Sequence, residues 1–507
     1  MSTFRAIAIC ALALCATRAR AFQAQETGTA AEARHELYAG RSAYAASLYQ
    51  KLVDRDPTNG DAYYGWVRAL LKAHKSQEAY AAAQQALEKA PHTSGAQAAA
   101  GLASFRRGDL VEAEEYYRAA YKLDPKDAGA LTGLASISSM VSKFKSARAL
   151  MLEAYRYAPE DPALMMAQAN SLKGAEHVAA LEKILAVYDS ESDEARGVRA
   201  HIANDRAIGD RKTRRLASPY QAERVKMLPL WDGPKRLRGM GLRVRFNDRE
   251  TATLLLDTGA SGIALSPKLA EKAGLEVLGH ESNETKGIGD QRGEDSLQYL
   301  ASQVKIGDVV FENYPVSVFR SAKSSDFEGL IGADVFARFL VGIDFVKNEL
   351  ALEPYPSGPP DQDDEPQDAD RDPPPGFYRA LRFGNHLTLI TTVNEHPSKL
   401  FLIDSGSSAN LIDQDVARQA ASVYGGSPVI VKGIQRKVEK TSMAQHVSLV
   451  FAGLRHDNPN LIAIDFAKMN DSFGVGMAGI LGMPVLGQLK LTIDYSNGAV
   501  RMQYNKP

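Results

Sequence analysis

The sequence predicts a multidomain protein in which an all-α solenoid of helical repeats is followed by two all-β lobes that form one bilobal unit with pseudo-two-fold symmetry. Two internal repeats support this fold class. The N-terminal third is rich in alanine and has a proline every 34 residues, whereas the C-terminal half contains two similar segments of short apolar runs and glycine turns. The chain has 507 residues, and single cores rarely exceed about 250–300 residues, so several domains are expected.

The first 21 residues have the pattern of an export signal. Arg5 precedes an apolar run from Ala6 to Ala16, which ends near Ala19-Arg20-Ala21, an A-x-A cleavage pattern. This run is too short to span a bilayer, which takes about 20 residues. We therefore expect residues 1–21 to be removed after Ala21. The mature protein is expected to be periplasmic or secreted, without an integral membrane segment.

The composition argues against several classes of function. The net charge is −1, so a nucleic acid is not expected as a partner. The only two cysteines, Cys10 and Cys15, lie in the export signal, so the mature chain has no thiol for a disulfide, a nucleophile or a metal site. The histidines are scattered, without an H-E-x-x-H motif or a paired spacing. The sequence therefore predicts neither a metal nor a cofactor.

The helical part is built on a 34-residue period. An alanine stands twelve residues before each of the four prolines that mark this period: Pro57, Pro91, Pro125 and Pro159. A 34-residue helix-turn-helix unit closed by proline resembles the tetratricopeptide repeat. The resemblance covers about residues 31–170, and further helix is expected to residue 208, so we place the helical domain at 31–208.

Stacked repeats of this kind leave a concave groove that commonly holds a peptide or a partner protein. We therefore expect a possible protein partner in the groove of the helical domain. The sequence leaves an alternative open, in which the helical domain is a spacer or a dimer surface.

The C-terminal half contains a second and longer repeat. Residues 254–265 read LLLDTGASGIAL, and residues 401–412 read FLIDSGSSANLI. Each copy is followed by a helix-like stretch and, further on, by an apolar-Gly element, GLIG at 329–332 and GILG at 479–482. The two copies are separated by 147 residues at the first landmark and by 150 at the second. This nearly constant separation predicts two homologous β-lobes.

An acidic, proline-rich segment separates the lobes, which we place at residues 220–356 and 377–507. The segment, residues 357–376, reads SGPPDQDDEPQDADRDPPPG and has almost no apolar side chains. Such a composition predicts a disordered and extended linker. The linker would keep the second lobe near the first, so that the lobes pair within one chain. Pairing of each lobe with its counterpart in another chain is the alternative.

The two aspartate motifs resemble those of the retropepsin- and pepsin-like aspartic peptidases. The family motif has two apolar residues, then Asp, Thr or Ser, and Gly, with an apolar-apolar-Gly element downstream, and both lobes contain it. The resemblance implies that Asp257 and Asp404 are catalytic. It also implies that the hydroxyl groups of Thr258 and Ser405 hydrogen-bond across the lobes and fix the two loops.

The residues after these hydroxyls lead to two further expectations. Gly259 and Gly406 let the backbone turn sharply and direct amide N–H groups at the carboxylates. Ala260 lacks a hydroxyl whereas Ser407 has one, so only the second lobe carries a hydroxyl that can donate to its carboxylate. Loss of such a donor raises the pKa of a carboxyl group. The activity optimum is therefore expected to be less acidic than that of a digestive enzyme.

A facing pair of carboxyl groups explains why aspartate ends such apolar runs. Two carboxylates about 4 Å apart repel by roughly 4 kcal/mol at an effective dielectric constant near 20. The pair therefore holds one proton over a broad pH range. The ionised member can take a proton from a water molecule while the protonated member polarises a carbonyl oxygen. The predicted function is that of an aspartic endopeptidase with a polypeptide substrate.

Two glycine-containing turns lie where retropepsins carry their flaps. A flap role implies substrate contacts from Gly287, Ile288, Gly289, Gly433 and Ile434. Two ordinary hairpin turns are the alternative interpretation. A second class of function also remains open, a non-catalytic peptide-binding or scaffold protein built on protease-like lobes.

Overall fold

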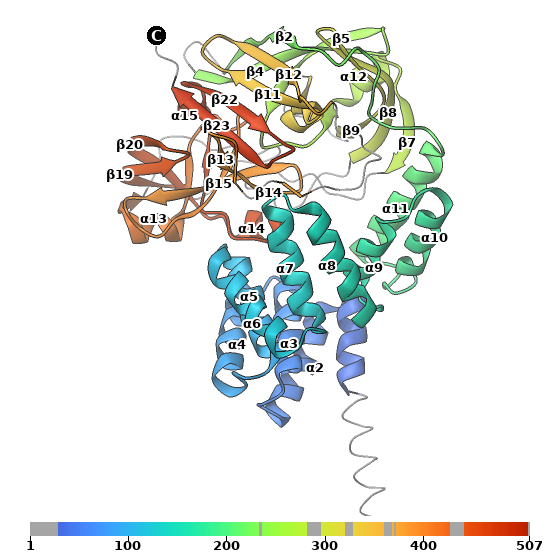
Figure 1. The fold of residues 1–507 in the computed structure, drawn as a ribbon, viewed down its shortest axis with the longest axis vertical. Coiled ribbons are helices and arrows are strands. Elements are labelled where there is room, and N and C mark those ends of the chain that lie inside the picture. The colour runs from blue at the N-terminus through green and yellow to red at the C-terminus, as the bar shows by residue number, and fades with distance from the viewer. Residues whose placement is uncertain are drawn as a thin grey trace, which may run out of the picture.

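The computed structural model describes residues 29–232, 236–280, 296–319, 328–358, 368–369, 372–425 and 441–504 (Figure 1). Within these ranges a helical solenoid leads into two β-lobes, which confirms the predicted fold class. The expected export signal (1–21) and both expected flap segments (287–289 and 433–434) lie outside the described residues. Among the helices that are described, none is long and apolar enough to cross a membrane.

The solenoid consists of helix pairs. After a helix over residues 29–38, the first helices of the pairs are α3 (Gly60–Lys72), α5 (Ser94–Arg107), α7 (Ala128–Met140) and α9 (Pro162–Ala169). The other helices are α2 (Ser42–Arg55), α4 (Ser76–Lys89), α6 (Leu110–Leu123), α8 (Phe144–Tyr157), α10 (Gly174–Leu185) and α11 (Asp193–Ile208). Equivalent helices begin 34 residues apart from α3 to α9 and from α2 to α8, as the proline spacing predicts.

Side-chain caps set the starts of the first helices of the pairs. Each cap accepts a backbone N–H from two or three residues later, and the caps are Asn59, Thr93, Asp127 and Asp161. A cap contributes about 1 kcal/mol, because it satisfies an amide that has no partner within the helix. Each cap follows one of the periodic prolines by two residues, so the repeat pattern of the sequence marks the helix starts.

The two ends of the solenoid contact each other. Arg68 of α3 forms an ion pair with Asp161 at the start of α9, with 2.7 Å between Nη1 and Oδ2. The backbone N–H of Asp189, between α10 and α11, donates to the carbonyl oxygen of Ala39 at 3.3 Å. These contacts join the early helices of the helical domain to its later ones.

Each β-lobe is a closed six-stranded barrel. In the first lobe, the strands follow the order β4 (Arg236–Phe246), β5 (Glu250–Asp257), β10 (Gly329–Gly332), β6 (Ile263–Leu265), β9 (Val309–Phe319) and β8 (Ser296–Ile306), which returns to β4. The second lobe has the same order in β15 (His386–Val393), β16 (Lys399–Ile403), β21 (Gly479–Leu481), β17 (Leu411–Asp413), β20 (Leu454–Ile464) and β19 (Ser442–Phe451). The lobes are therefore structural repeats.

Shorter elements extend both barrels. The first lobe adds β1 (Arg215–Leu216), β3 (Leu228–Asp232), α12 (Pro267–Lys272), β7 (Glu276–His280) and the 3-10 helix η1 (Ala333–Phe336). The second lobe adds β14 (Leu381–Phe383), α13 (Gln414–Ala420), β18 (Ser422–Gly425), α14 (Ala467–Phe473) and α15 (Met483–Leu486). Strand β1 precedes the expected start of the first lobe at residue 220 and pairs with β9.

A six-stranded sheet joins the two lobes. Its order is β13 (Tyr378–Arg379), β23 (Ala499–Tyr504), β22 (Leu489–Asp494), β11 (Phe339–Asp344), β12 (Glu349–Pro354) and β2 (Glu223–Lys226). At its centre, β11 of the first lobe pairs antiparallel with β22 of the second, with Val341 opposite Ile493. One buried apolar cluster continues through this sheet from lobe to lobe. The structure thus forms the pseudo-two-fold pairing within one chain.

Part of the segment between the lobes contacts the helical domain, so the prediction of a disordered linker is wrong for Asp368 and Ala369. Asp368 Oδ1 accepts the backbone N–H of Ser146 at 2.9 Å, and Ala369 N–H donates to the carbonyl oxygen of Ser142 at 3.0 Å. Helix α8 has no side-chain cap of its own at Lys143. Asp368 satisfies one of the free amides at its start, a role that composition alone does not reveal.

The helical domain also packs against the second lobe (Figure 1). Lys399 Nζ and Asp109 Oδ1 form an ion pair between the two parts at 2.8 Å. A Cβ atom at Gly476 would lie 2.5 Å from the carbonyl carbon of Arg107, so the two backbones touch at this glycine. Apolar side chains of both parts form one buried cluster, which includes Met140, Phe466, Val475 and Met477.

The substitution Gly476→Val should loosen this contact, because a side chain at this position overlaps the Arg107 backbone, which cannot move aside as a flexible side chain would. Overpacking of this kind costs about 1–3 kcal/mol. We expect a lower midpoint of thermal unfolding and faster release of the helical domain in limited proteolysis. Gly425→Val is the matched control, since nothing lies within 4 Å of a Cβ atom there. Equal behaviour of the two variants would contradict the packing described here.

Candidate active site

Both motif aspartates stand at the ends of central barrel strands. Asp257 is the last residue of β5 and lies beside Gly332 of the parallel strand β10. Asp404 directly follows β16, and its N–H donates to the carbonyl oxygen of Leu481 in β21 at 3.0 Å. The apolar runs before the two aspartates are buried in the barrels. Each carboxyl group is therefore carried by a strand that pairs on both sides.

The residues after the aspartates exchange hydrogen bonds across the lobes. Thr258 Oγ1 donates to the carbonyl oxygen of Ile403 at 2.9 Å and accepts the N–H of Ser405 at 2.9 Å. Reciprocally, Ser405 Oγ donates to the carbonyl oxygen of Leu256 at 2.8 Å and accepts the N–H of Thr258 at 3.0 Å. Both side chains are buried. The structure thereby brings together two motifs that lie 147 residues apart in the sequence.

Gly259 and Gly406 each lie against the aspartate of the opposite lobe. A Cβ atom at Gly259 would lie 2.6 Å from Asp404 Cγ, and one at Gly406 would lie 2.5 Å from Asp257 Cγ. Any side chain at either position would push the carboxyl groups apart. Neither glycine has a positive φ angle. Close approach between the lobes, rather than the expected sharp turn, is therefore the reason that glycine is needed.

The carboxyl groups of Asp257 and Asp404 are hydrogen-bonded to each other. Gly259 N–H donates to Asp257 Oδ1 at 2.8 Å, and the N–H groups of Gly406 and Ser407 donate to Asp404 Oδ1 at 2.9 and 3.0 Å. Burial raises the pKa of Asp257. Burial and the adjacent charge of Asp257 raise the pKa of Asp404 well above its usual range. The pair therefore retains a proton to higher pH than an isolated aspartate does.

The expected difference between Ala260 and Ser407 is wrong in its mechanism. Ser407 Oγ donates to the carbonyl oxygen of Ala409 at 2.8 Å and not to the carboxyl group of Asp404. The loop after Asp404 folds back on itself, so the hydroxyl group finds a backbone acceptor in its own turn. This hydroxyl therefore does not distinguish the carboxyl groups of the two lobes.

The sequence analysis missed a histidine close to the pair. His386 is the first residue of β15, and its ring meets that of Phe473 edge-on, with 5.3 Å between centroids. The positive charge of this ring lowers the pKa of Asp257. Burial lowers the pKa of His386 itself. The duplication of the lobes marks this position in the sequence. His386 lies 147 residues after Gly239, so the second lobe has an imidazole where the first lobe has no side chain.

A second missed group holds the loop that follows Asp257. Asp334 of η1 accepts the N–H of Gly262 at 2.9 Å and the hydroxyl of Ser261 at 3.0 Å. Asn385 of the second lobe donates to Asp334 Oδ2 at 2.8 Å, which adds a further bond between the lobes. The second lobe has no acid at the equivalent place, since Pro484 stands there. The lobes therefore fix their two loops with different side chains.

Two protein-family models match this chain, one in the β-lobes and one in the helical domain. A family model described as aspartyl protease matches residues 242–335 and 390–485, which contain Asp257 and Asp404. A tetratricopeptide-repeat model matches residues 64–128. The chain thus contains two aspartyl-protease regions and a tetratricopeptide-repeat region, as the sequence motifs indicated.

Comparison with individual proteins adds little. A search of curated proteins found no match. Among solved structures, the chain is similar to one described as the crystal structure of the APC/C hetero-tetramer Cut9-Hcn1, with a TM-score of 0.30 and 16% sequence identity. The similarity covers 35% of this chain and 35% of that one.

The substitution Thr258→Ala should destabilise the joined lobes. It leaves the buried N–H of Ser405 and the buried carbonyl oxygen of Ile403 without partners, and each such group costs about 1–3 kcal/mol. We therefore expect a loss of about 2–6 kcal/mol in the free energy of unfolding, measured by urea-induced unfolding. Thr258→Ser keeps the hydroxyl group and is the control. If the alanine variant is as stable as the serine variant, the cross-lobe bonds do not have the assigned role.

Proposed function

We propose that the protein is an exported aspartic endopeptidase in which Asp257 and Asp404 activate a water molecule for attack on a peptide bond. The observation that carries this proposal is the hydrogen-bonded pair of carboxyl groups at the contact between the lobes. The aspartyl-protease matches, which include both aspartates, support it. The proposed localisation, periplasmic or secreted, rests on the export pattern of residues 1–21.

The environments of the two carboxyl groups support different roles. Asp404, whose pKa is raised most strongly, holds the shared proton and donates a hydrogen bond to the carbonyl oxygen of the peptide bond. Asp257 is stabilised in its ionised form by amide N–H groups and by His386, and it takes a proton from the attacking water. The water oxygen bonds to the carbonyl carbon while the Asp404 proton passes to the carbonyl oxygen, which gives a tetrahedral diol. Asp257 then passes the proton taken from the water to the amide nitrogen, a diol hydroxyl returns a proton to Asp404, and the C–N bond breaks to leave a carboxylic acid and an amine.

The helical domain is proposed to dock the polypeptide substrate or a partner protein. Tetratricopeptide repeats support a role in protein interaction. Because the domain packs directly on the second lobe, a docked chain would have a fixed position relative to the carboxyl pair.

The Gly476→Val variant distinguishes substrate docking from hydrolysis of the peptide bond. If docking occurs, this variant should cleave an unfolded protein more slowly while short peptides are cleaved at an unchanged rate.

A non-catalytic peptide-binding or scaffold protein is the alternative function. Its supporting observation is the tetratricopeptide-repeat match, because such repeats support protein interaction whether or not the lobes are catalytic. The complete carboxyl pair and its amide donors favour the enzyme, because a scaffold does not need two acids in hydrogen-bonding contact.

The variants Asp257→Asn and Asp404→Asn should each lower the turnover of an unfolded protein substrate by about 10³-fold or more, because neither leaves a pair that shares one proton. Turnover is measured with and without a statine-type inhibitor, and circular dichroism verifies the fold. Asp308→Asn, an exposed substitution of the same kind, is the control and should keep full activity. Full activity in either active-site variant would refute the shared-pair mechanism. Peptide binding without turnover by the natural sequence would establish the alternative.

The substitution His386→Gln should move the acidic limb of the pH–rate profile to higher pH. The positive charge of His386 lowers the pKa of Asp257, so its removal raises that pKa, and Asp257 then needs a higher pH to ionise. His396→Gln, at an exposed position of the same lobe, is the control and should leave the profile unchanged. An unshifted acidic limb in His386→Gln would contradict the assignment of Asp257 as the ionised member.

A further inference from the structure

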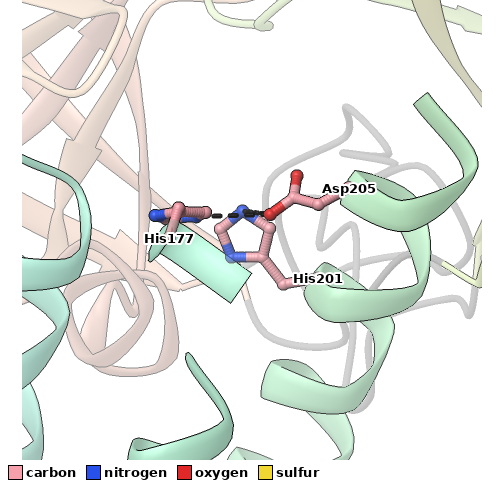
Figure 2. A group of neighbouring side chains, drawn as sticks. All are labelled: His177, His201 and Asp205. Carbon is pink, nitrogen blue, oxygen red and sulfur yellow. Dashed lines mark ion pairs between the residues drawn. The ribbon is translucent and has the colours of Figure 1, made fainter. Parts of the chain in front are cut away.

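Three polar side chains converge at the end of the helical domain, far from the carboxyl pair in sequence. His177 comes from α10, and His201 and Asp205 come from consecutive turns of α11 (Figure 2). Their ligand atoms all lie within 4.8 Å of one another. The histidine spacing in the sequence predicts no metal, because it contains neither an H-E-x-x-H motif nor a paired spacing. The His-x-x-x-Asp spacing of residues 201–205 places two donors on one helix face, and only the fold adds the third.

The hydrogen bonds of His177 orient one nitrogen toward the other two residues. Its Nδ1 lies 2.8 Å from the carbonyl oxygen of Ala169, an acceptor only, so Nδ1 carries the proton. In the neutral ring, Nε2 is then a lone-pair acceptor. A histidine that donates one N–H to a backbone carbonyl and presents its other nitrogen is the arrangement found at metal-ligating histidines.

This Nε2 atom faces another acceptor. It lies 3.2 Å from Asp205 Oδ2, and His201 Nε2 lies 3.8 Å from the same oxygen. Oδ2 is buried, yet it receives no hydrogen bond from any part of the chain that the structure describes. In the neutral form of His177, a lone pair on Nε2 faces the carboxylate oxygen, and a cation between the two atoms would remove the resulting repulsion.

We propose that His177, His201 and Asp205 bind a divalent transition-metal cation of the zinc class. Two imidazole nitrogens and one carboxylate oxygen match the donors that zinc prefers, whereas calcium and magnesium prefer oxygen ligands. Zinc bonds of about 2.0–2.1 Å in tetrahedral geometry place neighbouring ligand atoms about 3.4 Å apart. The distances of 3.2 and 3.8 Å to Asp205 Oδ2 lie on either side of this value.

The position of the three residues gives the cation a structural role. It would cross-link α10 to α11, next to the ion pair of Glu182 and Arg206 that joins the same helices. Helix α11 also contacts β7 of the first lobe (Figure 1), and a Cβ atom at Gly279 would lie 2.9 Å from Asn204 Oδ1. Asn204 directly precedes Asp205. A cation at this place would therefore stabilise the end of the helical domain that packs on the first lobe.

The test uses the full chain, freed of metal with a chelator. Titration with Zn²⁺ by calorimetry should show one site per chain, and Co²⁺ should give the visible absorption of a low-coordinate nitrogen and oxygen site. Zn²⁺ should also raise the midpoint of thermal unfolding of the helical domain, because it binds the folded state alone. Absence of stoichiometric uptake would overturn the proposal.

Variants identify the ligands. His177→Ala, His201→Ala and Asp205→Asn should each lower the affinity for Zn²⁺ at least tenfold, whereas His92→Ala, at an exposed position of the same domain, should leave it unchanged. The Asp205→Asn side chain keeps the size of the original, so loss of binding in a variant with normal circular dichroism cannot come from unfolding. Zn²⁺ affinity that persists in all three variants would overturn the assignment. None of these outcomes depends on peptidase activity.

Discussion

The contact between the carboxyl groups of Asp257 and Asp404 depends on the hydrogen bonds that Thr258 and Ser405 exchange across the lobes. Two facing carboxyl groups repel by roughly 4 kcal/mol when both are ionised, so they stay together only if the strands that carry them are held. Four buried hydrogen bonds and the pairing of β11 with β22 supply this constraint. Gly259 and Gly406 then allow the contact, because neither lobe has a side chain between the two acids.

The two lobes repeat one backbone but differ in the side chains that surround their aspartates. His386 stands where the first lobe has Gly239, and Asp334 has no acidic counterpart in the second lobe. A dimer of identical lobes would give both carboxyl groups the same environment. Fusion into one chain lets each aspartate have its own neighbours, and the charge of His386 lowers the pKa of Asp257 for this reason.

The helical domain contacts both lobes, and these contacts fix its position relative to them. Its middle helices share a buried apolar cluster with the second lobe, and α11 lies on β7 of the first lobe. Asp368 adds a third connection at the start of α8. A solenoid held at several points moves with the lobes rather than freely beside them, so any chain that it binds keeps a defined position relative to Asp257 and Asp404.

The sequence by itself determined the duplicated lobes and the strand ends at Asp257 and Asp404. It also determined the periodic helix starts at Asn59, Thr93, Asp127 and Asp161. These features follow from the sequence because turn residues and apolar runs act locally. The expected donor role of Ser407 and the expected disorder at residues 368–369 were wrong, since a hydroxyl or a carboxylate bonds whichever group the fold brings near it. Only the tertiary structure placed His386 beside Asp257 and His177 beside Asp205. Such contacts depend on the packing of distant segments, which no local pattern encodes.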